Sequence, residues 1–587
     1  MTPDPTMIPA LRRLDSLSGL SDAELAQIAR DAEIRTLPRG TVLMRRGDQP
    51  DALYLVLRGR FVVLSDGRPI AEIGTGEPVG EIGFFAGTPR SATVVAARES
   101  AVLRLGRDKY DALIAQSPQL VQGILATLAA RLGRSVAATP ELQPRAGRVS
   151  VVIEAGGRGL DPVLARGLQA EFAARFDWQT IVVTQAEGLA DAVARIEQDG
   201  QHVLLIVPDA QDDALTSAAL AQADTVVMVR DARDAPGLTG LEHRILAETL
   251  PENLHLARWF VSGQSVTGGG AWLADRPVAL HHNIRAGVAA DIARLGRFLR
   301  GEATGLVMCG GGSFGTAHFG ACKALQEAGI EIDMIGGTSI GSAIAGALAA
   351  GITPDDGIAM LEDMFLRKKA MSKYAFPRYS VLDHQVFDVE LRRHLGTGDI
   401  EDLRVPFFAV ATSLTEAARV TIRRGPLWQA VRASTSLPGI FQPFVTAEGH
   451  VWIDGGLMDN TPIGVMRSLK PGRNIVLGFP STEPMTSART YDRLPGRFEV
   501  MRSLVSGAPA DAPPSLFAIL ADAMTITSRR ALADIAPGED VFVEVPLPRG
   551  MSFLDWTRGR EAFDGAHRAL RDRLDGAGTP TLAMLRG

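Results

Sequence analysis

Residues 332–348, IDMIGGTSIGSAIAGAL, join a short apolar run, a glycine-bounded turn and an Ala/Ile/Leu-rich helical pattern without interruption. The turn contains the pentapeptide G-x-S-x-G, with Ser339 at its centre. A sharp strand-to-helix turn lifts a serine hydroxyl out of the sheet edge, and its glycines permit the crowded backbone that the turn requires. The new helix N-terminus also favours negative charge nearby. The segment predicts an α/β domain with Ser339 as a candidate nucleophile; a loop without chemistry is the alternative.

A second glycine-rich loop lies upstream, in residues 305–320, GLVMCGGGSFGTAHFG. An apolar strand leads into Gly310, Gly311, Gly312 and Ser313, whose backbone N–H groups can form an anion cradle. The anion is either a nucleotide phosphate or the oxyanion of a tetrahedral acyl intermediate. No G-x-x-x-x-G-K-[ST] motif is present, and no lysine directly follows the glycines. Because a candidate nucleophile follows on the next strand of a βαβ unit, we favour an oxyanion hole.

A third glycine turn supplies a carboxylate in residues 451–463, VWIDGGLMDNTPI, where a strand delivers Asp454. A serine nucleophile needs a base, which is usually histidine. The chain has 10 histidines, but none lies in a comparable strand-end setting after Ser339, and His450 is separated from Asp454 by strand geometry. A Ser339–Asp454 dyad is therefore the simpler arrangement. It requires a pKa of Asp454 raised by partial burial, so that the carboxylate can accept the seryl proton.

The glycine loop, GTSIG and the DGG turn together resemble the patatin-like phospholipase family, as does the intervening segment AVRASTSLPGIFQPF, residues 430–444. The resemblance covers roughly residues 305–560, and the whole-chain layout is similar to the neuropathy target esterase-like branch, which joins cyclic nucleotide-binding modules to a patatin domain. The resemblance implies that Ser339 is the nucleophile, Asp454 the base, and residues 310–313 the oxyanion-hole loop. It also implies a phospholipid or lysophospholipid substrate and no catalytic cofactor.

One position departs from the family pattern. The family loop usually reads G-G-G-x-[R/K]-G, and this chain has Phe314 at the basic position. Loss of one contribution to an oxyanion hole typically costs about 2.7–4 kcal/mol in the barrier. We therefore expect hydrolysis at a reduced rate. The alternative is a catalytically weak or inactive, nucleotide-responsive scaffold protein.

The N-terminal region combines a helix over residues 17–32, capped by Ser21 and Glu24, with short strands and glycine turns. This pattern predicts a small β-roll closed by a helical tail over residues 107–132. Residues 80–94, GEIGFFAGTPRSATV, resemble the phosphate-binding cassette of cyclic nucleotide-binding domains.

That cassette assigns a role to each of its polar residues. Arg90 offers a planar guanidinium to the cyclic phosphate, and Glu81 accepts from the ribose 2′-hydroxyl. Gly80 allows close approach of the backbone, while Ser91 and Thr93 offer hydroxyls. Taken singly, Arg90 and Glu81 are more often solvated surface charges than ligands, but their joint spacing predicts a cyclic nucleotide site. Ser91 favours cAMP over cGMP.

Residues 148–300 alternate apolar, strand-like runs with helical patterns, which predicts a parallel, Rossmann-like α/β domain. The glycine turn at residues 156–161 sits where a nucleotide loop could lie, but it has no Walker lysine. A degenerate, structural role is therefore favoured over nucleotide binding. His281 and His282 have no ligand cluster at metal spacing, so we treat them as packing or domain-interface residues and predict no metal site.

The fold class is thus a multidomain α/β chain. We expect a cyclic nucleotide-binding domain at residues 10–135, a linker at 136–147, a Rossmann-like domain at 148–300 and a patatin-like domain at 303–587 with its core at 305–470. A length of 587 residues exceeds what one core normally supports. Residues 481–514 are either a mobile lid or membrane-contacting loop, or an ordinary long surface insertion.

Bulk properties limit location and partners. The net charge is −6 and basic residues form no block, which argues against nucleic-acid binding. Only Cys309 and Cys322 occur, as is typical of a reducing cytosol. We expect no signal peptide and no transmembrane helix, because the start lacks an apolar h-region and no apolar run reaches 18 residues. The predicted location is cytoplasmic, with transient contact to the inner membrane face where lipid is reached.

Overall fold

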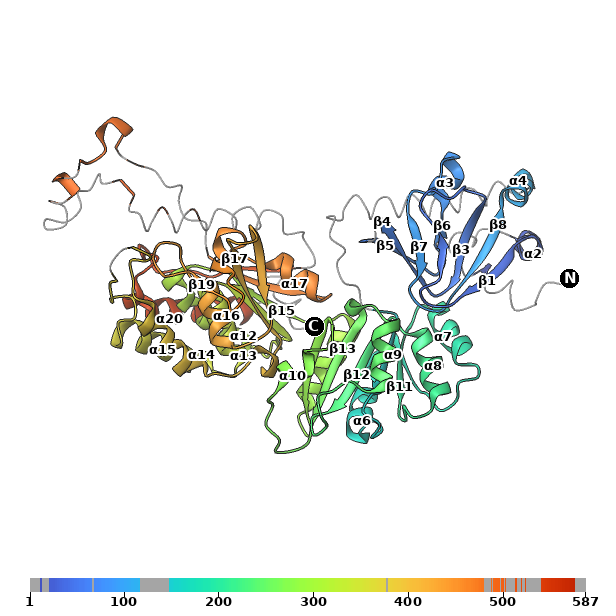
Figure 1. The fold of residues 1–587 in the computed structure, drawn as a ribbon, viewed down its shortest axis with the longest axis horizontal. Coiled ribbons are helices and arrows are strands. Elements are labelled where there is room, and N and C mark those ends of the chain that lie inside the picture. The colour runs from blue at the N-terminus through green and yellow to red at the C-terminus, as the bar shows by residue number, and fades with distance from the viewer. Residues whose placement is uncertain are drawn as a thin grey trace. The chain divides into compact units, whose positions relative to one another are not determined.

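A computed structural model describes residues 11–12, 21–65, 68–116, 147–375, 378–479, 487, 489–496, 498–500, 502, 513–514, 519, 523 and 540–575. The chain forms two compact units, residues 1–264 with 272–301 and residues 265–271 with 302–587. Figure 1 shows the elements of each. Nearly all of the expected linker, most of the expected lid and the end of the N-terminal helical tail lie outside the described residues.

The first unit begins with a β-roll, as the sequence predicts. Ser21 and Glu24 form the expected capping box on α2. Two four-stranded antiparallel sheets, β1-β8-β3-β6 and β2-β7-β4-β5, share one apolar core. The elements are α2 (Asp22–Asp31), β1 (Glu33–Leu37), β2 (Val42–Met44), β3 (Ala52–Arg58), β4 (Arg60–Ser65), β5 (Arg68–Gly74), β6 (Pro78–Val79), α3 (Glu81–Ala86), β7 (Thr93–Ala96), β8 (Ser100–Gly106) and α4 (Arg107–Gln116).

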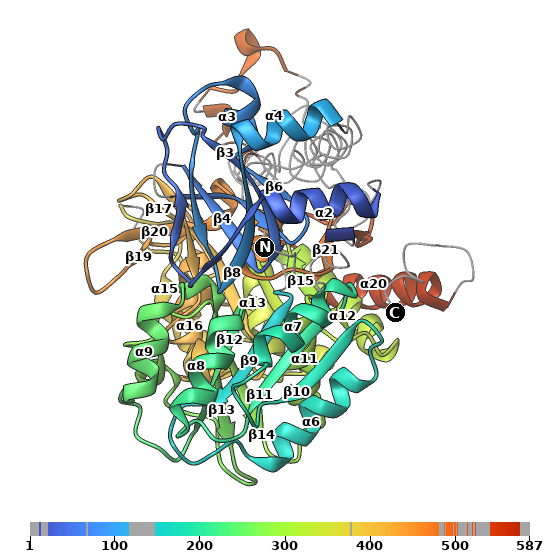
Figure 2. The same ribbon diagram turned by 90° about the vertical axis from the view of Figure 1, so that its right-hand side faces the viewer.

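The rest of this unit is a six-stranded, fully parallel sheet in the order β10-β11-β9-β12-β13-β14. Its strands are β9 (Val149–Glu154), β10 (Trp178–Val182), β11 (His202–Val207), β12 (Thr225–Asp231), β13 (Leu254–Phe260) and β14 (Leu280–Arg285). Helices α6 (Pro162–Ala173) and α11 (Ala289–Arg300) share one apolar core with the sheet. Helices α7 (Leu189–Gln198), α8 (Asp213–Gln222) and α9 (Gly240–Glu248) share a second core (Figure 2). Burial on both faces explains why β9 and β13 are apolar along most of their length.

Strand β14 was not among the strands expected from the sequence. It carries His281 and His282, and its paired histidines obscure the apolar pattern of a buried strand. His282 is buried with His255 of β13, and their Nε2 and Nδ1 atoms lie 3.1 Å apart. Of the two histidines, His282 thus packs in the interior of the domain.

A buried ion network connects the β-roll to the parallel sheet within this first unit. Arg98, between β7 and β8, contacts Glu197 of α7, and its Nε lies 3.1 Å from Oδ1 of Asp224. Arg60 reaches the same Asp224 oxygen at 3.3 Å. Oδ2 of Asp224 accepts from the N–H groups of residues 148 and 149 at 2.8 and 3.0 Å. Four charged groups thus meet in the interior, where Nε of Arg98 and Nε of Arg60 face Oδ1 of Asp224 as ion pairs without hydrogen-bond geometry.

The second unit contains an eight-stranded mixed sheet in the order β19-β20-β17-β16-β15-β21-β22, with β18 also paired to β17. Five neighbouring strands are parallel, and β18, β20 and β19 join by antiparallel pairing. The strands are β15 (Gly305–Met308), β16 (Met334–Thr338), β17 (Phe407–Ser413), β18 (Ala418–Ile422), β19 (Phe444–Val445), β20 (Val451–Asp454), β21 (Asn474–Gly478) and β22 (Asp540–Glu544). The strands expected near residues 407, 420 and 474 are confirmed.

Helices cover this sheet and bury its large apolar core. They include α12 (Thr316–Glu327), α13 (Ile340–Ala349), α14 (Pro354–Glu362), α15 (His384–Leu395), α16 (Leu427–Ser434), α17 (Ile463–Leu469) and α20 (Gly559–Asp575). Helix α12 follows the glycine loop and α13 follows Ser339, so both loops end in helix N-termini. Across the described part of the chain, every helix is too short or too polar to span a bilayer.

Candidate active site

Ser339 sits between β16 and α13 on a strained turn. Its φ and ψ are 54° and −128°, and positive φ is uncommon for a residue with a side chain. The flanking glycines are required by close packing, since a Cβ on Gly337 or Gly341 would lie 2.6 or 2.3 Å from the carbonyl oxygen of Met308. The predicted strand-to-helix turn is therefore present, and its glycines allow the backbone of the neighbouring strand β15 to approach the turn closely.

Asp454 ends β20 beside this turn. Thr338 pairs with Val410, and Asp454 pairs with the next residue of β17, so the register brings the two strand ends together. The Ser339 hydroxyl donates to Oδ2 of Asp454 at 2.6 Å, and the N–H of Gly456 donates to Oδ1 at 2.8 Å. Gly455 is needed here, since a Cβ would lie 2.3 Å from the carbonyl oxygen of Val410.

Burial governs the acidity of Asp454. Its side chain is 0 % exposed, and desolvation raises its pKa to about 7, although the hydrogen bonds from Ser339 and Gly456 act in the opposite direction. A carboxylate with this pKa is a far better proton acceptor than an ordinary aspartate, whose pKa is near 4. The arrangement can therefore accept the Ser339 proton near neutral pH.

Ser434 is a neighbour that the sequence reasoning missed as a site residue. Its hydroxyl accepts from the N–H of Ser339 at 3.0 Å and donates to the carbonyl of Val410 at 2.6 Å. Ser342 donates to the carbonyl of Ser339 at 2.7 Å. Ser434 lies in the segment 430–444 that carries part of the family resemblance, so that segment was the available signal. These contacts hold the strained backbone of Ser339 in one conformation.

The predicted oxyanion-hole residues divide into two pairs. The N–H of Gly310 donates to the carbonyl of Asn460 at 3.1 Å, and the N–H of Ser313 donates to the carbonyl of Phe553 at 2.8 Å. Among the described residues, none accepts from the N–H groups of Gly311 and Gly312. The loop runs directly beside the turn, since a Cβ on Gly310 would lie 3.1 Å from Cβ of Ser339. Two of the four predicted donors thus remain available to an anion.

No histidine takes part in this hydrogen-bond pair. His318 of α12 is fully buried, its Nε2 donates to the carbonyl of Cys309 at 3.0 Å, and burial lowers its pKa to about 4. His450 lies 3.4 Å from Glu416 instead. In the described part of the chain, the group that accepts from the Ser339 hydroxyl is the Asp454 carboxylate.

The five cassette residues of the β-roll also occupy neighbouring positions. Gly80 has φ of +79° and begins α3, and Glu81 and Arg90 are both buried. The Arg90 guanidinium donates to the carbonyls of Gly80 and Ala52, both at 2.5 Å. Thr93 accepts from the N–H of residue 46 at 3.1 Å, whereas Ser91 is exposed. A fixed, buried guanidinium beside a backbone-lined turn suits a phosphate ligand.

The glycine turn after β9 already holds an anion of its own. The Glu154 carboxylate accepts from the N–H groups of Gly156, Gly157 and Arg158 at 2.7, 2.8 and 2.8 Å. These are the donors that a nucleotide phosphate would use at this position. An incoming phosphate would have to displace a buried carboxylate of the same charge sign.

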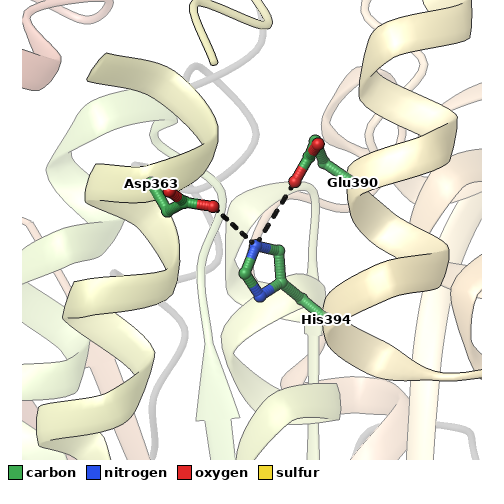
Figure 3. A group of neighbouring side chains, drawn as sticks. All are labelled: Asp363, Glu390 and His394. Atoms are coloured by element: carbon green, nitrogen blue, oxygen red, sulfur yellow. Dashed lines mark ion pairs between the residues drawn. The ribbon is translucent and has the colours of Figure 1, made fainter. Parts of the chain in front are cut away.

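One group of side chains in the described residues has the composition of a metal site, namely Asp363, Glu390 and His394. Figure 3 shows Nε2 of His394 between the two carboxylates, at 3.6 Å from Asp363 and 3.5 Å from Glu390. However, the Arg393 guanidinium contacts the same two carboxylate oxygens at 3.0 and 3.1 Å. Because arginine stays charged, Arg393 already forms an ion pair with each of these carboxylates, and the cluster is best described as an ion-pair network between two helical segments.

Comparisons with known proteins match two parts of the chain. A family model described as patatin-like phospholipase matches residues 306–467, which include the glycine loop, Ser339 and Asp454. Residues 306–467 thus form a patatin-like phospholipase domain. A second model, the cyclic nucleotide-binding domain, matches residues 34–117. Both parts of the resemblance expected from the sequence are therefore confirmed, and the chain joins a cyclic nucleotide-binding domain to a patatin-like phospholipase domain.

Several relatives share this sequence over most of its length. An NTE family protein of Mycobacterium bovis is 28 % identical over 520 residues, covering 86 % of each chain. The human patatin-like phospholipase domain-containing protein 6 is 27 % identical and matches 78 % of this chain but 38 % of its own. A protein of Coccidioides immitis named lysophospholipase NTE1 is 25 % identical over 91 % of this chain and 40 % of its own. The chain thus spans less than half of these two longer eukaryotic relatives.

Proposed function

We propose that this patatin-like phospholipase is a serine lipid acyl hydrolase that uses a Ser339–Asp454 dyad. The observation that carries the proposal is the 2.6 Å hydrogen bond from the hydroxyl of a strained, strand-end serine to a buried carboxylate. A histidine-free pair of this kind needs a carboxylate of high basicity, which the pKa of Asp454 near 7 supplies.

The reaction proceeds in two steps with one acyl-enzyme intermediate. Oγ of Ser339 attacks the ester carbonyl carbon while Asp454 takes the seryl proton. The proton then passes to the departing alcohol oxygen as the ester bond breaks. Asp454 next removes a proton from water, which attacks the acyl-enzyme, and the proton then returns to Oγ of Ser339 as the acyl–Oγ bond breaks and the fatty acid is released. The N–H groups of Gly311 and Gly312 stabilise the oxyanion in both steps, because Gly310 and Ser313 donate elsewhere.

A lysophospholipid or phospholipid is the proposed substrate class. The relative named lysophospholipase NTE1 and the patatin-like family model support this choice. Leu457 and Met458, three and four residues after Asp454, leave 47 % and 44 % of their surface exposed. Apolar side chains in this position suit transient contact with a lipid surface.

The test is release of fatty acid from lysophosphatidylcholine by the purified full-length protein. Time-dependent release that requires Ser339 supports the proposal. Labelling by a fluorophosphonate probe at Ser339 provides a second readout that does not depend on the head group. A protein that neither releases fatty acid nor reacts with the probe would instead fit the inactive scaffold alternative.

The pH dependence follows from the raised pKa of Asp454. Only the deprotonated carboxylate accepts the seryl proton, so kcat/KM should rise with pH and level off above about 7. At two pH units below the pKa, about 1 % of the carboxylate is ionised, so the rate near pH 5 should be about one hundredth of the plateau. A pH series of kcat/KM on a soluble thioester or p-nitrophenyl ester checks this. A profile that is flat from pH 5 to 9 contradicts the assigned base.

We further propose that cyclic nucleotide, with cAMP favoured over cGMP, binds at the Arg90 cassette and regulates hydrolysis. Regulation requires that the nucleotide bind one conformation of the chain better than another. The buried Arg90 guanidinium, the αL turn at Gly80 and the buried Glu81 support this site.

Arg90→Ala should weaken cAMP binding by about 100-fold, because a charge-assisted pair with phosphate typically contributes 1.5–3 kcal/mol. Arg90→Lys should give an intermediate loss, since lysine keeps the charge but not the planar fork. Isothermal titration with cAMP and cGMP measures both affinities, and thermal denaturation checks that each variant is folded. Binding of cAMP that is unchanged in Arg90→Ala would contradict the site.

A further inference from the structure

The segment at residues 552–553 accepts two hydrogen bonds from the glycine loop. The N–H of Ser313 donates to the carbonyl of Phe553 at 2.8 Å, and the Ser313 hydroxyl donates to the carbonyl of Ser552 at 2.9 Å. Ser313 itself is 0 % exposed, whereas Ser552 is exposed, so the bond from the Ser313 hydroxyl is partly buried. Both ends of the glycine loop are thus fixed, Gly310 by Asn460 and Ser313 by residues more than 200 positions away in sequence.

Aromatic packing reinforces these bonds at the position where the family has a basic residue. The Phe314 ring makes edge-to-face contacts with Phe479 and Phe553, with centroids 5.7 and 6.1 Å apart and interplanar angles of 70° and 83°. Contacts of this geometry are favourable beyond the area they bury. The Phe314 side chain therefore stabilises the loop by packing against two aromatic rings, where the family would use the charge of a basic side chain.

The same two aromatic residues also fill the space that the glycines leave. A Cβ on Gly312 would lie 2.4 Å from the carbonyl oxygen of Phe553 and 2.8 Å from its ring. A Cβ on Gly311 would lie 2.5 Å from the ring of Phe479. Gly311 and Gly312, whose N–H groups remain available, are thus the two glycines that pack against the Phe479 and Phe553 rings.

The segment at residues 552–553 is followed by residues that pack tightly on the helices of the second unit. Trp556 stacks on Phe365 with ring centroids 3.6 Å apart and an interplanar angle of 13°. Helix α20 packs closely on α12, where a Cβ on Gly320 would lie 2.1 Å from the carbonyl oxygen of Phe563. The segment therefore stands on rigid elements, which a positioning role requires.

We propose that Phe553, with Phe314 and Phe479, positions the oxyanion loop for the hydrolysis described above. A run of three glycines loses much conformational entropy when it is ordered, and oxyanion donors act only when they are already in place. The aromatic cluster and the two Ser313 bonds supply this order in place of the family's basic residue. The inference rests on the proposed function, and Phe553 acts through the loop without touching the reacting atoms.

Phe553→Ala should lower kcat by about 10- to 100-fold while KM changes by less than about threefold, because the loss falls on transition-state stabilisation. Phe553→Tyr keeps the ring and should restore most of kcat. Phe176→Ala, at an exposed phenylalanine in the first unit, is the control and should keep kcat. Hydrogen exchange of the peptide containing residues 310–315 should accelerate at least tenfold in Phe553→Ala and stay at the wild-type rate in Phe553→Tyr.

The two readouts separate failure of this inference from failure of the proposed function. If wild type and Ser339→Ala release fatty acid equally, the proposed function fails, yet loop exchange still tests the positioning role. Unchanged kcat or unchanged loop exchange in a folded Phe553→Ala would overturn the inference. If Phe553→Ala does not fold, Ser313→Ala carries the test, since it removes only the hydroxyl bond to Ser552 and should also accelerate loop exchange.

Discussion

Ser339→Ala is expected to reduce kcat for lysophosphatidylcholine by about 10⁴- to 10⁶-fold, the range seen when a serine nucleophile is removed and only binding and oxyanion contacts remain. The substitution removes the single atom that can form the acyl-enzyme. It also removes the hydroxyl that donates to Asp454 at 2.6 Å. The measurement is fatty acid release under saturating substrate, with fluorophosphonate labelling as a parallel readout.

Asp454→Asn should reduce kcat by about 10²- to 10⁴-fold, the usual contribution of a positioned base. The amide oxygen can still accept from the N–H of Gly456, so the turn should keep its shape. The amide nitrogen would then face the Ser339 hydroxyl, and it cannot accept a proton. The pH rise through 7 should disappear together with the activity.

Matched controls come from the same unit. Ser468→Ala removes a hydroxyl that donates to the carbonyl of Val465 in α17, and Asp355→Asn removes an exposed partner of Lys323. Both should keep wild-type kcat. Retention of more than about a tenth of wild-type turnover by either dyad variant would contradict the assigned roles.

Asp224→Ala is expected to lower the free energy of unfolding of the first unit by about 3–5 kcal/mol, the usual cost of removing one partner of a buried ion pair. Burial alone would raise the pKa of Asp224, but Arg98, Arg60 and two backbone N–H groups together hold it below the ordinary value. Without Asp224, the buried Arg98 and Arg60 lose their shared partner.

Acid should weaken the same network. A carboxylate whose pKa is lowered by folding stabilises the protein above its unfolded pKa, and this contribution is lost as the pH falls through the folded value. The Asp224→Ala variant should therefore show a smaller loss of stability between pH 5 and pH 3 than wild type. Urea denaturation of the full-length chain at several pH values measures both effects.

Asp213→Ala is the control for this prediction. Asp213 begins the helix that ends just before Asp224, but it is exposed and its partner Arg244 lies at the surface. Surface pairs contribute about 0–1 kcal/mol, so this change should be nearly silent. Equal destabilisation by Asp213→Ala and Asp224→Ala would show that the buried network contributes nothing specific. Because the network joins the β-roll to the parallel sheet, its loss should also separate their unfolding into two transitions.

Short-range chemistry made the core of the site predictable from sequence. The glycines around Ser339 and after Asp454 are required because a Cβ at these positions would lie 2.3 to 2.6 Å from a backbone carbonyl oxygen, and such a requirement is visible in the sequence as a motif. The β-roll and the parallel sheet likewise follow from local periodicity and turn residues, whereas the patatin-like fold was implied by the resemblance of three glycine-rich turns to that family. The capping box of Ser21 and Glu24 was also predictable from the sequence, because both of its residues lie within four positions of each other.

Other features depend on partners far away in sequence. The four residues of the glycine loop look equivalent in sequence, but Asn460 and Phe553 engage the N–H groups of Gly310 and Ser313. Strand β14 was not predicted because its two histidines interrupt the apolar pattern expected of a buried strand, although its pairing with β13 buries most of its residues. Likewise, the Glu154 carboxylate accepts from the N–H groups of the glycine turn after β9. Residue spacing alone does not predict that the Glu154 side chain points into this turn.

The sequence by itself determined the two turns, the residue types at their tips and the order of the domains, because steric limits on the backbone act between near neighbours. Only the tertiary structure decided which N–H groups stay available, how Phe314 is accommodated and why the pKa of Asp454 lies near 7. Those properties depend on desolvation and on hydrogen bonds between segments that meet only when the chain has folded.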